Sequence, residues 1–148
     1  PLYYNAKPTT HRGYLFSSDA PLFAFGHGLS YTKFTLSPPR LSSAKIAKGD
    51  NVTVEVDVHN AGTRAGDEVV QIYVHDQIAT VTRPVMELKA FKRVALAAGE
   101  RKTVSLTLDA EAFHMWNRKM QFVIEPGKFD IMAGPNSVDL QSTVLEIV

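Results

Sequence analysis

The sequence contains no cysteine, and this absence removes several kinds of chemistry at once. Disulfide bonds, thiolate metal sites and a cysteine nucleophile are all excluded. An excess of one charge is also missing, because the formal net charge is only +1 at pH 7. No apolar run approaches the roughly 20 residues that a membrane-spanning helix needs. Nothing here favours a nucleic-acid partner or a membrane partner, and we expect neither.

The length and composition suit a single globular domain with an extension. Of the 148 residues, 45% are hydrophobic and 21% are charged, which is enough to build a buried core. The chain begins at Pro1 rather than at methionine, and no charged-then-apolar leader follows. We therefore expect it to be a piece of a longer polypeptide.

Residues 1–32 differ in composition from the rest of the chain. They are rich in tyrosine, phenylalanine, proline and glycine, and they show little helical or strand periodicity. Their large aromatic side chains, which need burial, are Tyr3, Tyr4, Tyr14, Phe16, Phe23 and Phe25. The segment is either an ordered arm packed on its own domain or the end of a neighbouring domain. We favour the second alternative, because a row of exposed aromatic residues is unusual in a free-standing protein.

From residue 33 onward the pattern is that of β-strands. Between Val52 and Val58, valine alternates with polar residues, which predicts a strand with one buried face and one solvated face. A shift of one residue would bury Glu55 and Asp57, so the register of this strand is firmly set. Residues 66–76, GDEVVQIYVHD, contain apolar side chains on both faces, which predicts a central strand.

Further strands follow at short spacing and are separated by turn signals. They are predicted at 89–96, at 101–109 with Val104, Leu106 and Leu108 facing inward, at 113–116, at 121–124, around 129–131 and at 138–148. Turns are predicted at 60–62, 98–99, 117–119, 125–127 and 134–136. In the last strand the alternation of apolar residues shifts by one position between Leu140 and Leu145, which predicts a bulge or a bend near Ser142. Seven or eight such strands predict an all-β fold, an antiparallel β-sandwich of the immunoglobulin-like or fibronectin type III-like kind with an extended aromatic N-terminal arm.

Few residues suggest catalysis or metal binding. The five histidines are His11, His27, His59, His75 and His114, and none has the HxH or HExxH spacing of a zinc site. His59 and His75 lie on neighbouring predicted strands and could approach each other, although two solvated histidines are the plainer interpretation. Glu55 and Asp57 share a solvated face, and a filled sandwich offers no cleft for a catalytic pair of carboxylates.

Three other motifs are weak signals. Ser30 lies in GLSYT, which lacks the second glycine of the GxSxG nucleophile motif. The GHG at 26–28 does not extend to GxGxxG, so its glycines are expected to serve a tight backbone path. Trp116 with Phe113 and Tyr73 could form a platform for sugar rings, but core packing is the favoured interpretation. We therefore assign no catalytic, cofactor-binding or metal-binding residue and expect no cofactor.

Four stretches carry a specific signature when they are taken together. They are HRGYLFSSDAPLFAFGHGLSYTKF at 11–34, HNAGTRAGDEVVQIYVHD at 59–76, TRPVMELKAFKRVALAAGERKTVSLTL at 82–108 and WNRKMQFVIEPGKFDIMAGPNSVDL at 116–140. In this order they resemble the C-terminal region of glycoside hydrolase family 3, the β-glucosidase and β-xylosidase family. Two positions depart from the family pattern, since Ala90 stands where glycine is usual and Ala24 where proline is common.

The resemblance implies a domain organisation and a function. Residues 33–148 would form a fibronectin type III-like domain, and residues 1–32 would end a preceding α/β sandwich domain and link the two. Members of the family are retaining enzymes whose catalytic Asp and Glu lie upstream of the matched region, so no catalytic role is carried over. We expect a non-catalytic accessory domain of a retaining β-glycosidase that stabilises the catalytic domains and packs against them. The alternative is a carbohydrate-binding module.

Partners and location follow from the same resemblance. The expected partners are the catalytic domains of the same polypeptide, and we predict that the connection from Asp76 to Leu88, with Arg83-Pro84, faces them. Carbohydrate contact and self-association through an uncovered aromatic face both stay open. The family favours a periplasmic or secreted location.

Overall fold

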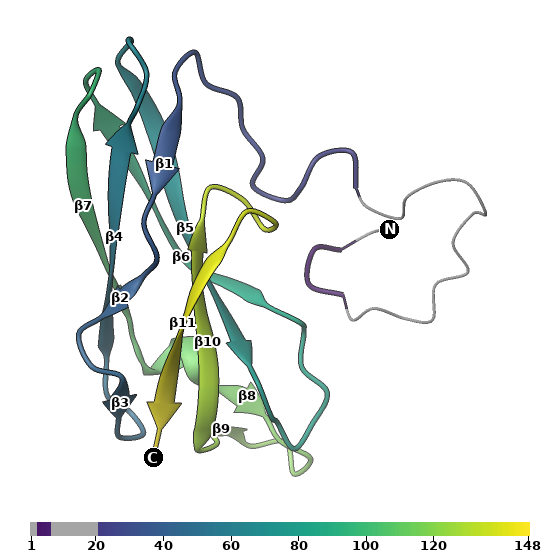
Figure 1. The fold of residues 1–148 in the computed structure, drawn as a ribbon. Coiled ribbons are helices and arrows are strands. Elements are labelled where there is room, and N and C mark those ends of the chain that lie inside the picture. The colour runs from purple at the N-terminus through teal and green to yellow at the C-terminus, as the bar shows by residue number, and fades with distance from the viewer. Residues whose placement is uncertain (1–2, 7–20) are drawn as a thin grey trace.

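The structure is a computed structural model that describes residues 3–6 and 21–148. This part of the chain folds into two packed β-sheets joined by short turns, with a small third hairpin at one end (Figure 1). The prediction of an all-β sandwich is confirmed. Seven of its eleven strands have three residues or more, which agrees with the predicted number. Within the described ranges, no helix is long and apolar enough to cross a membrane.

The first sheet is built around β4 (Val52–Asn60). Strand β7 (Arg101–Leu108) pairs with it antiparallel along eight residue pairs. Strands β1 (Phe34–Leu36) and β2 (Arg40–Leu41) also pair antiparallel with β4, at its end and at its middle respectively.

The second sheet has the order β3 (Lys45–Ile46), β11 (Gln141–Ile147), β10 (Gly127–Gly134), β5 (Gly66–Asp76) and β6 (Glu87–Leu96). Its pairings are antiparallel except for one, because the short β3 runs parallel to β11. The predicted antiparallel sandwich therefore has one parallel contact at an edge.

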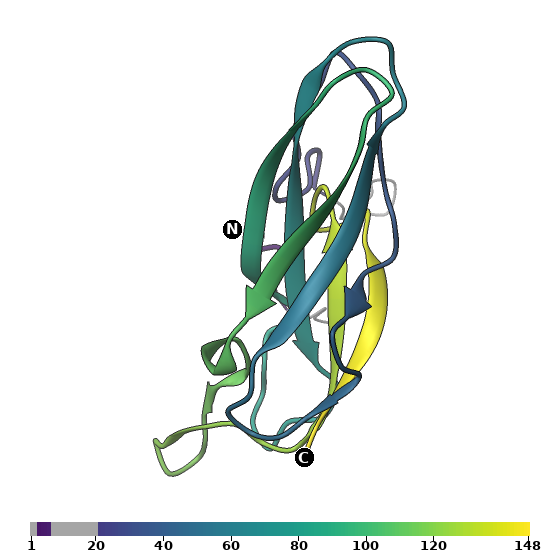
Figure 2. The same ribbon diagram turned by 90° about the vertical axis from the view of Figure 1, so that its left-hand side faces the viewer.

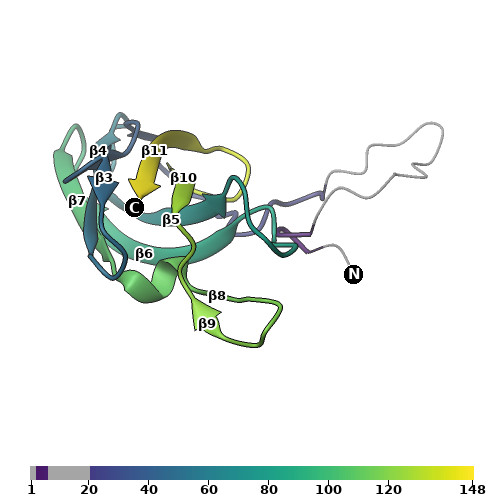
Figure 3. The ribbon, with the colours of Figure 1, turned by 90° about the horizontal axis from the view of Figure 1, so that it is seen from below.

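A small hairpin lies outside the two main sheets. After the short 3₁₀ helix η1 (Ala110–Phe113), strands β8 (Met115–Trp116) and β9 (Phe122–Val123) pair antiparallel. Figures 2 and 3 show this hairpin projecting from one end of the sandwich. The predicted strands at 113–116 and 121–124 thus exist in shortened form.

The core lies between the two sheets and follows the predicted alternation. All four valines of β4 are fully buried, and each polar neighbour on that strand is only partly exposed. Val104 and Leu108 of β7 are buried and Leu106 is partly buried against the same cluster. The other fully buried side chains of the core are Val70, Ile72, Leu96, Phe113, Phe129, Ile131, Ala133, Leu145 and Ile147.

Strand β5 is central, as predicted, and its apolar character on both faces has a specific cause. Val70, Ile72 and Val74 face the core between the sheets. Gln71 and Tyr73 point to the opposite side of the strand and are also buried there. The N-terminal segment covers them, because Gly26 bonds Gln71 and the ring of Tyr4 packs on Tyr73. The apolar outer face of β5 therefore reflects the docked arm.

The last strand corrects one prediction. Pairing between β10 and β11 runs without interruption from Gly127↔Ile147 to Ala133↔Gln141, so the bulge predicted near Ser142 is wrong. The alternation of apolar residues shifts because Val138 and Leu140 belong to the loop before β11 and not to the strand. A register shift occurs elsewhere, between β5 and β6, where Ile72 pairs with Ala90 and Tyr73 with Leu88.

Candidate functional site: the arm and its junction with the sandwich

Residues 21–32, called the arm here, are held on the second sheet by backbone and side-chain hydrogen bonds. The amide of Ser137 donates to the carbonyl of Phe25 at 2.9 Å. At the far end, Thr32 Oγ1 donates to Asn60 Oδ1 at 2.6 Å, and the amide of Ala61 donates to the carbonyl of Lys33 at 2.7 Å. The arm is thus fastened both near its middle and where it enters β1.

Gln71 is the hub of the inner attachment. Its side chain is buried, and its Nε2 donates to the carbonyls of Pro135 at 2.6 Å and Gly26 at 3.3 Å. Its Oε1 accepts a hydrogen bond from the hydroxyl of Tyr73 at 2.6 Å. A buried amide is stabilising only when such partners are present, so this group ties the arm, the β10–β11 loop and β5 into one unit.

Gly26 fits this hub for two geometric reasons. Its φ is +80°, in the left-handed region that favours glycine. A Cβ atom at this position would lie 2.2 Å from Oε1 of Gln71. The prediction that the GHG glycines serve a tight backbone path is therefore confirmed for Gly26. It is wrong for Gly28, where a Cβ atom would meet nothing within 4 Å.

Residues 3–6 add an aromatic contact to the same junction. The ring of Tyr4 stacks on Phe25 with centroids 4.2 Å apart and meets Tyr73 edge-on at 5.9 Å. The hydroxyl of Tyr4 accepts from the amide of Leu88 at 3.1 Å, and the carbonyl of Asn5 accepts from the amide of Val85 at 3.2 Å. Burial, with a smaller contribution from Tyr4, raises the pKa of Tyr73 to about 12, so this phenol stays protonated and donating.

The outward side of the arm is apolar and uncovered. Leu29 and Tyr31 are 92% and 96% exposed, and Leu22 and Phe23 are also exposed. Beside them, a mostly apolar hollow of about 620 Å³ opens between the 3–5 segment, the arm and the β10–β11 loop. Its walls are Tyr3, Tyr4, Asn5, Pro21, Phe23, Phe25, Met86, Ser137 and Val138. Clustered exposed apolar side chains of this kind are typical of surfaces that contact another macromolecule or domain.

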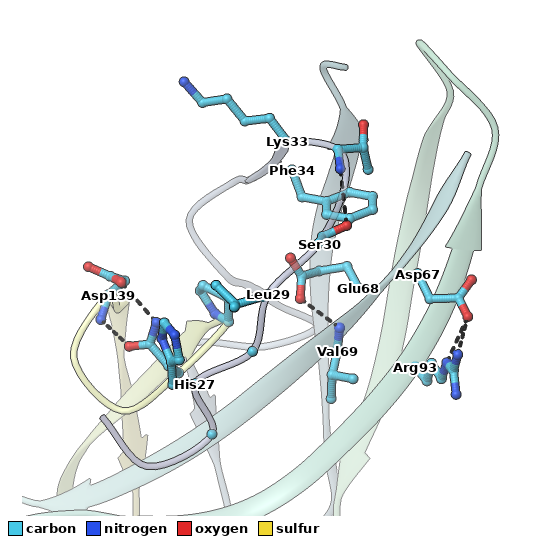
Figure 4. A pocket seen from close by; sticks show the side chains of 15 residues that line it. His27, Leu29, Ser30, Lys33, Phe34, Asp67, Glu68, Val69, Arg93 and Asp139 are labelled. Atoms are coloured by element: carbon cyan, nitrogen blue, oxygen red, sulfur yellow. Dashed lines mark hydrogen bonds and ion pairs between the residues drawn. The ribbon is translucent and has the colours of Figure 1, made fainter. Parts of the chain in front are cut away.

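A second, more polar hollow of about 500 Å³ lies on the other side of the arm (Figure 4). Figure 4 shows Glu68 of β5 below Ser30 of the arm and Lys33, which follows the arm. Burial raises the pKa of Glu68, and the N–H of Val69, which donates to its Oε1 at 2.8 Å, opposes that shift. The hollow therefore offers a half-buried acceptor to a hydrogen-bond donor from outside.

The other carboxylates of this hollow are already engaged. Asp67 forms an ion pair with Arg93, whose Nε donates to it at 2.8 Å. Asp139 accepts from Nδ2 of the buried Asn136 at 2.8 Å. The hollow thus offers binding groups, and the structure brings together no nucleophile and base there. Across residues 3–6 and 21–148, no group of three or more His, Asp or Glu side chains could hold a metal ion.

The predicted candidate residues are largely kept apart. His59 lies on β4 in the first sheet and His75 on β5 in the second, so the approach considered for them does not occur. Ser30 accepts only a local hydrogen bond from the amide of Thr32, at 3.3 Å. His27 lines the polar hollow. His11 lies outside the described residues.

The aromatic platform is corrected. Phe113 and Tyr73 are fully buried on different parts of the fold, so they cannot form a surface with Trp116. The expectation that Trp116 packs in the core is also wrong, because it is 58% exposed on β8. Glu55 and Asp57 do share a solvated face, where Arg40 pairs with both of them.

Sequence reasoning missed the two buried polar hubs. Gln71 and Asn60 were not singled out, yet both are buried and both anchor the arm. Asn60 also donates from Nδ2 to the carbonyl of Arg64 at 2.7 Å. One signal was available, since Gln71 is a single amide within the apolar run VVQIYV. A lone amide in such a run needs a specific partner.

The β5–β6 connection is fastened to its own domain at several points. Arg83 donates from Nη1 to the carbonyl of His114 at 3.1 Å and pairs with Glu87 at 2.7 Å. Thr80 donates from its amide to Glu125 at 3.0 Å. Burial raises the pKa of Asp76 at the start of the connection, opposed by the amide of Ile78 and by Arg83. The connection is therefore an ordered surface next to residues 3–6.

Comparison with known proteins agrees with this architecture. The family model for the fibronectin type III-like domain matches residues 68–137. A periplasmic β-glucosidase of Salmonella typhimurium is 41% identical over 147 residues, covering 99% of this chain and 19% of that protein. A β-xylosidase of Formosa agariphila is 45% identical over 136 residues, covering 90% of this chain and 19% of that protein.

Solved structures give the same result. A β-glucosidase structure from Erythrobacter marinus superposes with a TM-score of 0.94 at 44% identity, over 100% of this chain and 20% of that one. A β-glucosidase from Listeria innocua in complex with glucose has a TM-score of 0.89 at 36% identity, over 99% of this chain and 22% of that one. The chain spans about a fifth of the length of these relatives.

The fold and the junction define a fibronectin type III-like β-sandwich domain with an attached arm. Within that class, the chain is similar over almost its whole length to about a fifth of several β-glucosidases and β-xylosidases. The resemblance seen in the sequence is thereby confirmed.

Proposed function

We propose that this chain is the accessory sandwich domain of a retaining β-glycosidase that hydrolyses β-glucosides or β-xylosides. In this role it performs no bond cleavage itself, and it stabilises the catalytic domains of the same polypeptide by packing against them. Residues 33–148 are the accessory domain, and residues 1–32 end a preceding α/β sandwich domain and cross into it.

One observation carries this proposal: the arm is rigidly attached on its inner side and apolar on its outer side. The hub at Gln71 fixes the path of the arm, while Leu29 and Tyr31 are left almost fully exposed. Such a surface is costly in water and is stabilised when a neighbouring domain covers it. The apolar hollow beside Phe23 extends the same face.

The β5–β6 connection belongs to this face in the proposal. Residues 3–6 contact it through Tyr4 and Asn5, so the chain that precedes the arm lies against it. We therefore keep the expectation that the connection from Asp76 to Leu88 meets the catalytic domains. A periplasmic or secreted location is part of the same proposal, supported by the relative from Salmonella typhimurium, which is named as periplasmic.

The test compares the same variants in two proteins, the isolated 148-residue chain and the longer polypeptide. Leu29→Asp and Tyr31→Asp alter fully exposed side chains, so we expect the thermal midpoint of the isolated chain to change by no more than about 2 °C. In the longer polypeptide, each substitution would bury a charge at the domain contact. We expect its thermal midpoint to fall by roughly 5 °C or more.

Trp116→Ala is the matched control, because it removes exposed aromatic surface away from the arm. It should leave both midpoints unchanged. Equal, small effects of Leu29→Asp and Tyr31→Asp in both proteins would overturn the proposed docking face. Hydrolysis of aryl β-glucosides and β-xylosides by the longer polypeptide, but not by the isolated chain, is the expected activity result.

A further inference from the structure

The β8–β9 hairpin carries a row of aromatic rings that the proposed docking face does not use. Trp116 and Phe122 are directly opposed in the ladder, with ring centroids 5.2 Å apart and planes tilted by 40°. The ring of His114 also stacks on Phe122, with centroids 4.6 Å apart and an angle of 19°. We call these three rings the aromatic row.

The aromatic row is held rigidly from behind. Met115, the neighbour of Trp116, is buried on the opposite side of the hairpin. His114 Nδ1 lies 2.8 Å from the carbonyl of Ala110, and its own carbonyl accepts from Arg83 at 3.1 Å. The turn is closed by Asn117, whose Oδ1 accepts from the amides of residues 119 and 121 at 2.8 and 3.0 Å. A preorganised surface of this kind loses little conformational entropy when a ligand binds.

The outer side of the aromatic row is uncovered and bordered by polar side chains. Trp116 and Phe122 are 58% and 48% exposed. The turn beside them supplies Arg118, Lys119 and Gln121 as exposed hydrogen-bonding groups. Residues 114–124 contain no aspartate or glutamate, so nothing on this segment repels an uncharged or electron-rich ligand.

The direction of the hairpin separates this surface from the arm. Figure 3 shows the β8–β9 hairpin projecting from the sandwich away from the side on which residues 21–32 lie. A neighbouring domain that covers the arm therefore need not cover the aromatic row, although the row borders the β5–β6 connection where Arg83 bonds the carbonyl of His114. The row also contributes nothing to the core, since its members are absent from the buried cluster between the sheets.

We propose that the aromatic row binds an extended β-linked glycan, such as a β-glucan or xylan chain, and this rests on the proposed function as a β-glycosidase domain. The pyranose rings of such chains present flat C–H faces, which pack on the electron-rich faces of indole and phenyl rings. Their ring hydroxyls reach the polar side chains of the turn. Two tilted rings in sequence suit consecutive, mutually twisted sugars of one chain.

A lipid surface fits this hairpin less well. The turn at the tip of the hairpin spans residues 117–121, where Arg118 and Lys119 stand beside the exposed Met120, and the rings lie on the side of the hairpin rather than at its end. Insertion of the tip would bury two cations before Trp116 reached the hydrocarbon region. The geometry favours a ligand laid along the side of the hairpin.

The first test measures binding by the 148-residue chain itself. Trp116 is the only tryptophan, so its fluorescence reports on the aromatic row directly. We expect xylohexaose or cellohexaose to change this fluorescence saturably, and maltohexaose, which is α-linked, to leave it unchanged. Absence of a response to both β-linked oligosaccharides would overturn the proposal.

The second test uses variants and affinity electrophoresis in gels that contain xylan or β-glucan. Trp116→Ala and Phe122→Ala should weaken the association by about tenfold, the scale seen for removing one stacked aromatic ring. Tyr31→Ala removes an even more exposed aromatic side chain from the arm and should change the association by less than about twofold. Equal retardation of Trp116→Ala and the unaltered chain would contradict the assignment.

Two further outcomes separate this proposal from its rivals. Sedimentation with vesicles of phosphatidylcholine and phosphatidylglycerol, without retardation by glycans, would assign the aromatic row to a membrane instead and overturn the proposal. A fall in the thermal midpoint of the longer polypeptide on Trp116→Ala, as large as that for Tyr31→Asp, would show that a neighbouring domain covers the row. The arm variants test the proposed docking independently, so either idea can fail alone.

Discussion

Replacing Gln71 with leucine tests the hub that fixes the arm. The two short hydrogen bonds of this side chain, to Pro135 and from Tyr73, are both 2.6 Å long and lie in buried surroundings. Leucine is similar in size but leaves the carbonyl and the hydroxyl without a partner. The third bond, to the carbonyl of Gly26, is 3.3 Å long and contributes less.

The magnitude follows from these contacts. Each unsatisfied buried group costs about 1–3 kcal/mol, and burial of the leucine side chain recovers roughly 1 kcal/mol. With two such groups, we therefore expect Gln71→Leu to lower the free energy of unfolding by about 1–5 kcal/mol. For a chain of this size, a loss of about 3 kcal/mol corresponds to a thermal midpoint lower by roughly 6–12 °C.

The assay is urea unfolding of the 148-residue chain followed by Trp116 fluorescence and circular dichroism. The dependence of the unfolding free energy on urea should stay unchanged, so that the shift in midpoint reports stability alone. Gln141→Leu is the matched control, because Gln141 donates to the carbonyl of Leu36 at 2.8 Å in an exposed position where water can replace it. That variant should lose no more than about 1 kcal/mol. A loss below about 0.5 kcal/mol for Gln71→Leu would refute the reasoning.

Three other predictions concern the junction and the register. Gly26→Ala, which combines a φ of +80° with a Cβ 2.2 Å from Gln71, should lower the free energy of unfolding by about 1–3 kcal/mol in urea unfolding, and an unchanged midpoint would contradict the assigned backbone path. Burial raises the pKa of Glu68 in the folded state above its pKa in the unfolded state. The protein therefore loses stability as the pH rises from the unfolded-state pKa through the folded-state pKa, because the buried carboxyl must then ionise. Glu68→Gln should therefore raise the thermal midpoint at about pH 7 and raise it less at about pH 4, and an equal gain at both would argue against the desolvated carboxylate. Leu145→Ala should cost about 2–5 kcal/mol, whereas Val144→Ala on the exposed side of β11 should cost about 1 kcal/mol or less, and the reverse order would restore the bulge in that strand.

The sequence was sufficient where alternation and burial coincide. Strand β4 is the clearest case, because Val52, Val54, Val56 and Val58 can all be buried in only one register. The turn after Asn60, the last residue of β4, was predicted from its Asn-Ala-Gly sequence. Its second role, as a buried anchor for Thr32, could not be predicted, because that contact joins residues 28 positions apart.

The alternation of apolar residues alone predicted the start of the last strand wrongly. Val138 and Leu140 are apolar and adjacent to β11, so they look like part of it in sequence. In the structure Leu140 donates its amide to the carbonyl of Val138 at 3.0 Å, which is a local loop contact. The pairing with β10 that defines the strand begins only at Gln141.

The candidate site was predictable in composition but not in geometry. The aromatic richness of the N-terminal segment indicated a contact surface, and Leu29 and Tyr31 are exposed as that idea requires. Trp116 was expected in the core because tryptophan is usually buried in sandwiches, yet β8 places it on a projecting hairpin. Which sheet carries each histidine also depended on topology, which separates His59 from His75.

Hydrogen–deuterium exchange tests the central claim most directly, namely that the outer face of the arm is covered in the longer polypeptide. The amides of residues 21–32 and of the connection from Asp76 to Leu88 would be compared between the isolated 148-residue chain and that polypeptide. We predict exchange slower by about tenfold or more in the longer polypeptide at both segments, with no change in β4 beyond its existing protection. Identical exchange rates in the two proteins at both segments would contradict the account.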